Sequence, residues 1–229
     1  MLALVGSGEY LPDVDLIDKT LLGRLAEPAR VVCLPTAAGQ EGAAMVQSWM
    51  DKGVAHFQRL GVPVTAVPVI DATTAHNPDY ATIIRQANFV YLSGGNPGYL
   101  ADCLAGSPVW EAILGIHQQG GVVAGCSAGA MIMGERIAGP RGSRDGFNLL
   151  PGTLIMPHFD EFPGLISRVV RLFSGRSLTM IGVDGRTALV VDNELAGENG
   201  RYEVLGSGHV TVFSSNSTQK YGQGERPVW

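Results

Sequence analysis

The most informative segment of this sequence is Gly121-Val122-Val123-Ala124-Gly125-Cys126-Ser127-Ala128-Gly129, which continues into Ala130-Met131-Ile132-Met133. An apolar run, a Gly-x-Ser-x-Gly motif and a helix-favouring segment follow one another without a gap. A sharp turn from a strand into a helix has room for a serine only where the residues two before and two after it lack a Cβ atom. Gly125 and Gly129 meet that requirement. The stretch therefore predicts a nucleophile elbow that lifts the Ser127 hydroxyl clear of a sheet.

The neighbouring Cys126 is a second candidate nucleophile, because a thiol is a better nucleophile than an alcohol. The spacing of the small residues decides against it. An elbow centred on Cys126 would place Ala124 and Ala128 at the two positions that require glycine. We therefore assign the nucleophile to Ser127.

Length and composition predict a single α/β domain over residues 1–229, since a chain of 229 residues that is 45% hydrophobic can bury a large core. The net charge of −5 argues against a nucleic-acid partner. No apolar run is long enough to span a membrane. The N-terminus lacks the features of a secretory signal, and the three cysteines are widely spaced, so a cytoplasmic protein with reduced thiols is expected.

Short apolar runs alternate with helical patterns over the first two-thirds of the chain, which predicts a mostly parallel central sheet. The runs show no polar alternation, as expected for strands covered on both faces. The expected strands are Leu2–Val5, Val31–Leu34, Val62–Val69, Phe89–Leu92, Val122–Ala124 and Thr153–Met156.

The C-terminal part of the chain changes character and predicts antiparallel strands. These strands are Ala188–Val191, Arg201–Leu205 and His209–Phe213. Gly206-Ser207-Gly208 is expected to join the last two as a β-hairpin, which makes His209 a hairpin residue.

One long helix is expected to begin at about Glu41, and its apolar stripe consists of Val46, Met50, Val54 and Phe57. His56 lies off this stripe, so we expect it to be solvated or partly buried. The same expectation applies to His117, which precedes the elbow strand.

Polar and glycine-rich segments follow several expected strands, at the edge where ligands bind in open parallel sheets. A serine hydroxyl needs a neighbouring base to take its proton. Of the five histidines, His158 alone follows an expected strand on that edge, so it is our candidate base. The segments are Gly6-Ser7-Gly8-Glu9, Pro35-Thr36-Ala37-Ala38-Gly39, Ser93-Gly94-Gly95-Asn96, Ser127 and Pro157-His158-Phe159-Asp160.

A carboxylate should orient the imidazole, and backbone N–H groups should bind the oxyanion. Asp160, two residues after the histidine, is our first choice for the acid. The expected oxyanion donors are Ala128, which follows the serine, and a residue of the segment 94–96, whose glycines allow close approach of a substrate. The acids that remain open as alternatives are Asp145, Glu135 and Asp184.

Three segments together resemble the serine peptidases grouped as aspartyl dipeptidase (peptidase E) and cyanophycinase. They are Phe89-Val90-Tyr91-Leu92-Ser93-Gly94-Gly95-Asn96, then Gly125-Cys126-Ser127-Ala128-Gly129-Ala130, then Leu149-Leu150-Pro151 with Pro157-His158-Phe159. The resemblance extends from Leu2 to about Val191. It implies a class I glutamine amidotransferase-like fold, which is a three-layer α/β sandwich with a mostly parallel central sheet.

The resemblance also implies site residues: Ser127 as nucleophile, His158 as general base and an oxyanion hole formed by Gly95 and Ala128. It leaves the third triad member open. In the dipeptidases the acid lies between serine and histidine, which points to the stretch Glu135–Asp145. The amidotransferases use an acid two residues after the histidine, which points to Asp160.

The chain departs from both branches of this family at the substrate-binding segments. Cyanophycinases carry an arginine-rich stretch after the histidine and a Gly-Gly-Asp-Gln-type loop, where this chain has Phe162-Pro163-Gly164 and Asn96. Hydrolysis of the Asp-Arg polymer is therefore not expected. Aspartyl dipeptidases need a cation for the acidic side chain of the substrate, and Arg171, with Arg168 one helical turn away, is the candidate. Asn96 and Arg171 are the expected substrate contacts.

The sequence thus predicts a serine peptidase that hydrolyses small peptides, Asp-X among them, through an acyl-enzyme and without a metal or organic cofactor. Its expected partner is a small peptide, not nucleic acid or a membrane, and a homodimer is the candidate assembly. Two alternatives stay open. One is an amidotransferase-like domain that binds a small molecule or a partner without turnover, and the other is hydrolysis of esters or other amides.

Overall fold

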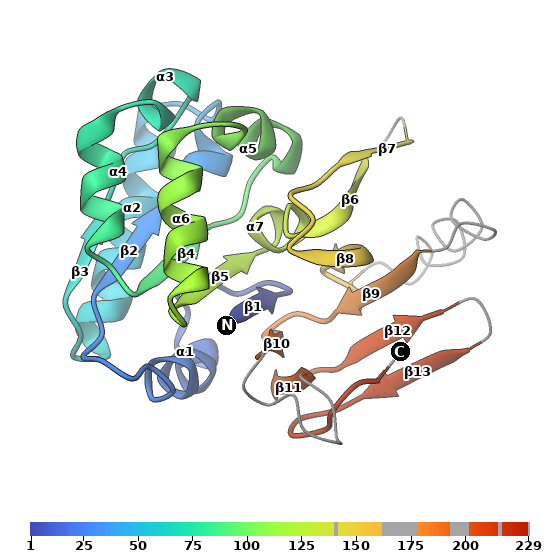
Figure 1. The fold of residues 1–229 in the computed structure, drawn as a ribbon. Helices are drawn as coiled ribbons and strands as arrows, with labels where there is room; N and C mark the ends of the chain where they lie inside the picture. Colours follow the sequence, from blue (N-terminus) through green and yellow to red (C-terminus); the bar gives the residue numbers. More distant parts are fainter. Residues whose placement is uncertain (140–141, 162–177, 193–201, 215–216, 229) are drawn as a thin grey trace.

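A central seven-stranded sheet organises the molecule (Figure 1). A computed structural model of the chain describes residues 1–139, 142–161, 178–192, 202–214 and 217–228. The strand order is β11-β10-β1-β5-β4-β2-β3, and the five strands from β1 to β3 in that order are parallel. These strands are β1 (Leu2–Val5), β2 (Val31–Leu34), β3 (Val64–Ala66), β4 (Phe89–Leu92), β5 (Val122–Cys126), β10 (Thr187–Val191) and β11 (Tyr202–Gly206).

Helices cover both faces of this sheet, so the predicted three-layer α/β architecture is confirmed. On one face, Ala3 and Val5 of β1 pack in a core with residues of α1 and α2, whereas Leu2 and Leu4 point into a second core with residues of α3 to α7. The strands β1, β2, β4, β5 and β10 are buried along their whole length, which explains why their sequences are mostly apolar. The helices are α1 (Asp15–Leu22), α2 (Ala43–Arg59), α3 (Ala72–Ala75), α4 (Pro78–Arg85), α5 (Pro97–Leu104), α6 (Pro108–Gln118) and α7 (Ala128–Met131).

A second, six-stranded sheet lies beside the first, on the right in Figure 1. It contains the expected strand Thr153–Met156, so the expectation of a sixth strand in the central sheet is wrong. After α7, the four-residue helix that follows β5, the chain enters β6 at once. It therefore lacks a crossover helix that would return it to the central sheet. The strands, in the order of the sheet, are β13 (Thr218–Tyr221), β12 (Val210–Phe213), β9 (Thr179–Val183), β8 (Leu150–Pro157), β6 (Gly134–Gly139) and β7 (Gly142–Asp145).

The C-terminal hairpin is formed by β12 and β13, one strand later than expected. The predicted pairing of β11 with β12 is wrong, because β11 pairs with β10 and β12 pairs with β9. The connection 206–209 runs along the connection between β9 and β10: Ser207 N donates to Arg186 O (3.1 Å) and Asp184 N donates to His209 O (3.0 Å). Both connections therefore cross from one sheet to the other together.

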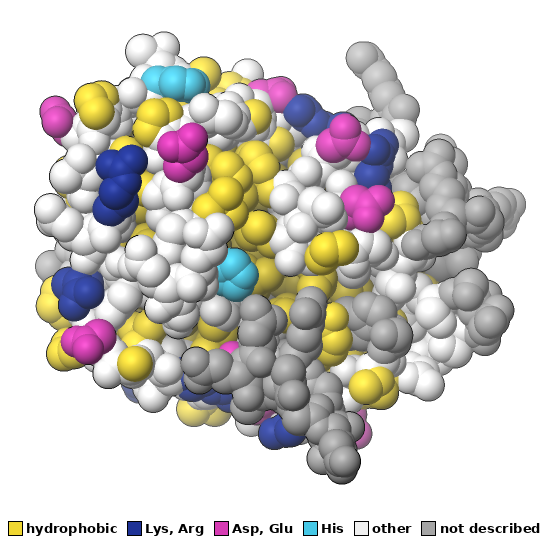
Figure 2. All heavy atoms as spheres, viewed as in Figure 1, with side chains coloured by type: hydrophobic (Ala, Val, Ile, Leu, Met, Phe, Trp, Pro, Cys, Tyr) yellow, Lys and Arg dark blue, Asp and Glu magenta, His cyan; other side chains and the backbone are white. Residues whose placement is uncertain are grey.

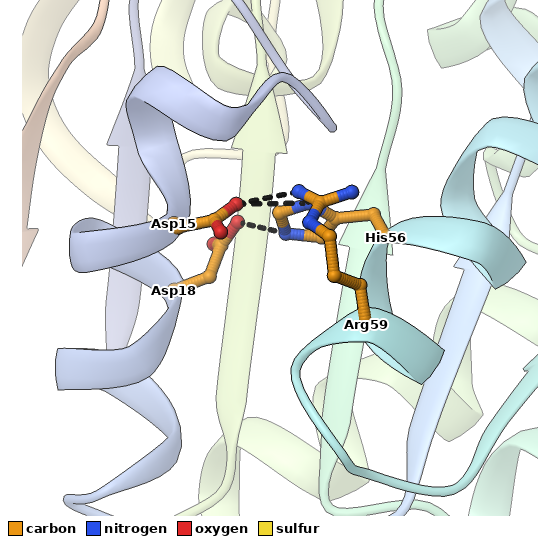
Figure 3. Close-up of polar contacts among 4 residues, drawn as sticks. All are labelled: Asp15, Asp18, His56 and Arg59. Carbon is orange, nitrogen blue, oxygen red and sulfur yellow. Dashed lines mark hydrogen bonds and ion pairs between the residues drawn. The ribbon is translucent and has the colours of Figure 1, made fainter.

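The expectation that His56 is solvated or partly buried is also wrong: its side chain is fully buried between α1 and α2 (Figure 3). Its Nε2 lies 2.7 Å from Asp18 Oδ2, and Arg59 Nη2 donates to its Nδ1 at 2.9 Å. Arg59 also donates to Asp15 Oδ1. An arginine can only donate hydrogen bonds, so Nδ1 of His56 is the acceptor for Arg59. Nε2 therefore carries a hydrogen and donates a hydrogen bond to Asp18 Oδ2. His117 is half-buried, as expected.

Among the helices that the structure describes, none is long and apolar enough to cross a membrane.

Candidate active site

The predicted strand–turn–helix is present around Ser127, which lies between β5 and α7 with φ 50° and ψ −108°. A side chain can hold this conformation only where its neighbours leave space. A Cβ on Gly125 would overlap the carbonyl of Gly129, and a Cβ on Gly129 would collide with Leu92 O. The two glycines therefore let β4, β5 and α7 pack around the turn, and Ser127 N is held by Val5 O at 3.0 Å.

Cys126, the residue before Ser127, is fully buried. Its Sγ donates to Glu9 Oε2 at 3.0 Å. Burial, followed by the Glu9 carboxylate, raises the pKa of this thiol well above its usual value. A buried, protonated thiol is a poor nucleophile. The packing therefore supports the choice of Ser127 over Cys126.

His158 follows β8 in the second sheet, and its Nε2 lies 2.6 Å from Ser127 Oγ. The residue has a φ of 141°, a conformation that non-glycine residues seldom adopt. Its side chain is 30% exposed, so the serine–histidine pair is open to solvent. The structure thus brings together the two residues that the sequence selected from different strand ends.

In the part of the chain that the structure describes, the carboxylate found close to the other imidazole nitrogen belongs to Glu161, a residue that the sequence analysis did not select. Glu161 Oε2 lies 3.8 Å from His158 Nδ1. The carboxylate of Asp160 accepts from Gly185 N (2.8 Å) instead. Glu161 follows His158 by three residues, and this spacing in the sequence could have identified it as a candidate acid. The three alternative acids have other partners: Glu135 accepts from Gly152 N, Asp145 pairs with Arg136, and Asp184 accepts from His209 N.

The two expected oxyanion donors belong to two segments next to the serine, α7 and the loop after β4. Ala128 is the first residue of α7, where a backbone N–H has no acceptor within the helix. In the loop after β4, a Cβ on Gly94 would come within 3.3 Å of Ser127 Cβ, so this loop lies against the serine. Gly95 has a φ of 141°, and a Cβ there would collide with Ala37 O. Only glycine fits this position.

A cavity of about 800 Å³ begins at Gly95 and extends between the start of α5 and the β6–β7 hairpin. Asn96, an expected substrate contact, is part of its wall, together with Glu41 and Arg144. Arg144 Nη1 donates to Asp102 Oδ2 (3.0 Å), and this pair lowers the pKa of Asp102 and raises that of Arg144. Gly95, the expected oxyanion donor, borders this cavity, whereas Ser127 and His158 are not among its lining residues.

Charged side chains of both signs alternate over β6 and β7, whereas apolar side chains gather in the middle of the same face (Figure 2). Arg168 and Arg171, the predicted cations for an acidic substrate, lie outside the described residues. Within the described part of the chain, no group of three or more His, Cys, Asp or Glu side chains is placed to hold a metal ion.

Comparisons with known proteins agree with this fold. The model of Peptidase family S51 matches residues 2–198. A cyanophycinase of Geminocystis herdmanii (strain PCC 6308) is 26% identical over 193 residues, which cover 76% of this chain and 67% of that protein.

Two solved structures are similar over almost their whole length. A peptidase from an acI-B1 Actinobacterium has a TM-score of 0.88 and 32% identity, covering 100% of this chain and 96% of that one. A putative peptidase E from Listeria monocytogenes EGD-e shares the fold, with a TM-score of 0.59 and 17% identity over 99% of this chain and 98% of that one. The predicted resemblance is confirmed: this chain belongs to peptidase family S51 and is a serine peptidase.

Proposed function

We propose that this peptidase hydrolyses small peptides, Asp-X dipeptides among them, with Ser127 as nucleophile and His158 as general base. One observation carries the proposal: His158 Nε2 lies 2.6 Å from Ser127 Oγ at the tip of a strained strand-to-helix turn. This is hydrogen-bonding distance for the proton that must move when the serine attacks.

The reaction begins when Ser127 Oγ forms a bond to the scissile carbonyl carbon and its proton passes to His158 Nε2. The carbonyl oxygen becomes an oxyanion, which the N–H groups of Gly95 and Ala128 stabilise. The tetrahedral intermediate collapses as His158 returns the proton to the leaving amine, leaving an acyl group on Ser127. Water then attacks the acyl carbon while His158 takes its proton, and His158 returns this proton to Ser127 Oγ as the acyl bond breaks and the acid leaves. No step requires a metal or an organic cofactor.

Protonated His158 needs a carboxylate that stabilises its charge and orients the ring. Glu161 is the first candidate for this role, supported by the 3.8 Å between its Oε2 and His158 Nδ1. Asp160, the first choice from the sequence, is the second candidate. Its hydrogen bond to Gly185 N holds the segment after His158 against the β9–β10 connection, which would position the histidine through the backbone.

The proposed substrate site is the cavity that begins at Gly95. Its volume of about 800 Å³ suits a short peptide. Asn96 in its wall offers an amide for the polar groups of the substrate, and Arg144 offers a guanidinium that would contact the substrate while it remains paired with Asp102. Arg171 remains a proposed contact for an acidic side chain. These features support a peptide with a free carboxylate as substrate.

The test is hydrolysis of a panel of dipeptides and tripeptides with varied N-terminal residues, including Asp-X and β-Asp-Arg. Wild type is compared with Ser127→Ala and with Ser48→Ala, a matched control on α2. We expect turnover that Ser127→Ala abolishes and Ser48→Ala preserves. Turnover restricted to Asp-X supports the finer substrate assignment. Cleavage by Ser127→Ala at the wild-type rate would refute the mechanism.

We also propose a cytoplasmic location, supported by three free, buried thiols at Cys33, Cys103 and Cys126. Cell fractionation with detection of the native protein tests this, and recovery in the secreted fraction would contradict it.

A further inference from the structure

Glu9, in the loop after β1, joins the two segments that flank the proposed reaction centre. Its Oε1 accepts a hydrogen bond from Gly94 N at 2.9 Å, and its Oε2 accepts one from Cys126 Sγ at 3.0 Å. Gly94 directly precedes the proposed oxyanion donor Gly95, and Cys126 directly precedes Ser127. A single carboxylate therefore connects the loop after β4 to the elbow after β5.

The loop after β4 has anchors on the side of β2 as well. Ser93 Oγ donates to Leu34 O (3.0 Å), and Asn96 N donates to Ala37 O (2.9 Å). On the side of the serine, the loop is held by the hydrogen bond from Gly94 N to Glu9 Oε1. Without that bond, Gly94 and Gly95 would be less restrained, because glycine has more backbone freedom than any other residue.

The Glu9 carboxylate is tightly packed against Gly94 and accepts hydrogen bonds from both Gly94 N and Cys126 Sγ. A Cβ on Gly94 would lie 2.8 Å from Glu9 Oε1 and 3.3 Å from Ser127 Cβ, so the loop, the carboxylate and the nucleophile are mutual neighbours. The Cys126 thiol is a donor in this arrangement, because burial and the Glu9 charge raise its pKa. Hydrogen bonds that a carboxylate accepts from such donors are stronger than bonds between neutral groups.

We propose that Glu9 is a positioning residue of the active site, which sets the Gly94–Gly95 peptide at the correct distance and direction from Ser127 Oγ. This inference rests on the proposed function of Ser127. Glu9 does not take part in proton transfer in this proposal. It acts through Gly95, by aligning an oxyanion donor before the substrate arrives, and small errors in such alignment are costly for the rate.

The test is the rate at which a fluorophosphonate probe modifies the enzyme. In this reaction Ser127 Oγ forms a bond to phosphorus, fluoride leaves, and the serine proton passes to His158, so no peptide substrate has to be known. The phosphoryl oxygen uses the same oxyanion donors. The limiting rate kinact reports this alignment, and the probe concentration at half-maximal rate, KI, reports binding.

We compare wild type, Glu9→Gln, Glu9→Ala and the exposed control Glu27→Gln. Glutamine keeps the shape and one acceptor oxygen, whereas alanine removes both bonds. We expect kinact to fall by about 3- to 10-fold for Glu9→Gln and about 10- to 100-fold for Glu9→Ala, with KI within about twofold of wild type. Glu27→Gln should match wild type. A kinact for Glu9→Ala within about twofold of wild type would overturn the proposal.

A second pair of variants covers the case in which Glu9 variants fail to fold, as judged by thermal unfolding. Cys126→Ser keeps a donor for Glu9 Oε2, and Cys126→Ala removes it. We expect kinact to be lower in Cys126→Ala than in Cys126→Ser, and equal values would overturn the proposal. Ser127→Ala separates the two levels of inference: if it still reacts with the probe, the proposed function fails and this inference fails with it. If Ser127→Ala is inert and the Glu9 and Cys126 variants are unaffected, only the positioning role fails.

Discussion

His158 Nε2 and Ser127 Oγ lie 2.6 Å apart although 31 residues separate them along the chain. The serine follows β5 of the central sheet, and the histidine follows β8 of the second sheet. The site is therefore assembled at the junction of the two sheets, and its geometry depends on how β8 packs beside α7.

His158→Asn should abolish the activation of Ser127, because asparagine cannot take the serine proton. We expect kcat on a peptide substrate to fall by about 10³-fold or more, with a smaller change in KM. Steady-state kinetics provide the measurement. His76→Asn, which changes an exposed histidine at the C-terminal end of α3, is the control and should retain wild-type kcat. Retention of kcat in His158→Asn would exclude His158 as the base.

Glu161→Gln and Asp160→Asn distinguish the two candidate acids. If Glu161 stabilises protonated His158, its replacement should lower kcat by about 10- to 100-fold, because the carboxylate is half exposed and partly screened. Asp160→Asn keeps an acceptor oxygen for Gly185 N, so we expect a change of at most about threefold. Measured kcat values in the reverse order would assign the role to Asp160.

Arg144→Ala should raise KM for peptides with a free carboxylate by about 3- to 30-fold and leave kcat nearly unchanged, because the cavity wall loses its guanidinium. Arg136→Ala is the matched control: Arg136 belongs to the same hairpin and also pairs with an aspartate, Asp145, but it does not line the cavity. Equal KM values for the two variants would show that Arg144 does not contact the substrate.

Thiol reagents should leave the native enzyme active. Cys33, Cys103 and Cys126 are all buried, and burial raises the pKa of each thiol, to about 12 for Cys33. A raised pKa means that the reactive thiolate is scarce at pH 8. We expect iodoacetamide at pH 8 to label the three cysteines only after unfolding. Rapid inactivation of the folded enzyme, with modification of Cys126 found by mass spectrometry, would contradict this arrangement.

Asp18→Ala should destabilise the fold without touching the site, because it leaves His56 Nε2 without its buried acceptor. We expect a loss of about 3 kcal/mol in the free energy of unfolding. Asp18→Asn keeps an acceptor and should lose less. The exposed Asp51→Ala on α2 should be close to wild type. Urea denaturation measures all three, and equal stability of Asp18→Ala and Asp51→Ala would refute the role of the pair.

The elements that depend on local interactions could be predicted from the sequence. The bounds of β1, β2 and β4 follow from apolar runs that are buried on both faces. The elbow at Ser127 follows from two glycines that admit a sharp turn. These features depend on residues that are neighbours along the chain, so they can be predicted from the sequence.

Contacts between segments that are distant along the chain could be identified only in the folded molecule. In the folded molecule β8 belongs to the second sheet, and β11 and β12 belong to different sheets. His56 is buried against Asp18. The fold also brings Glu161 to His158, and Glu9 to Gly94 and Cys126. A charged residue after a strand has the same local pattern whether it is solvated or paired. Its role is set by the groups that long-range packing places within hydrogen-bonding distance, because electrostatic and hydrogen-bond energies depend on separation in space and not along the chain.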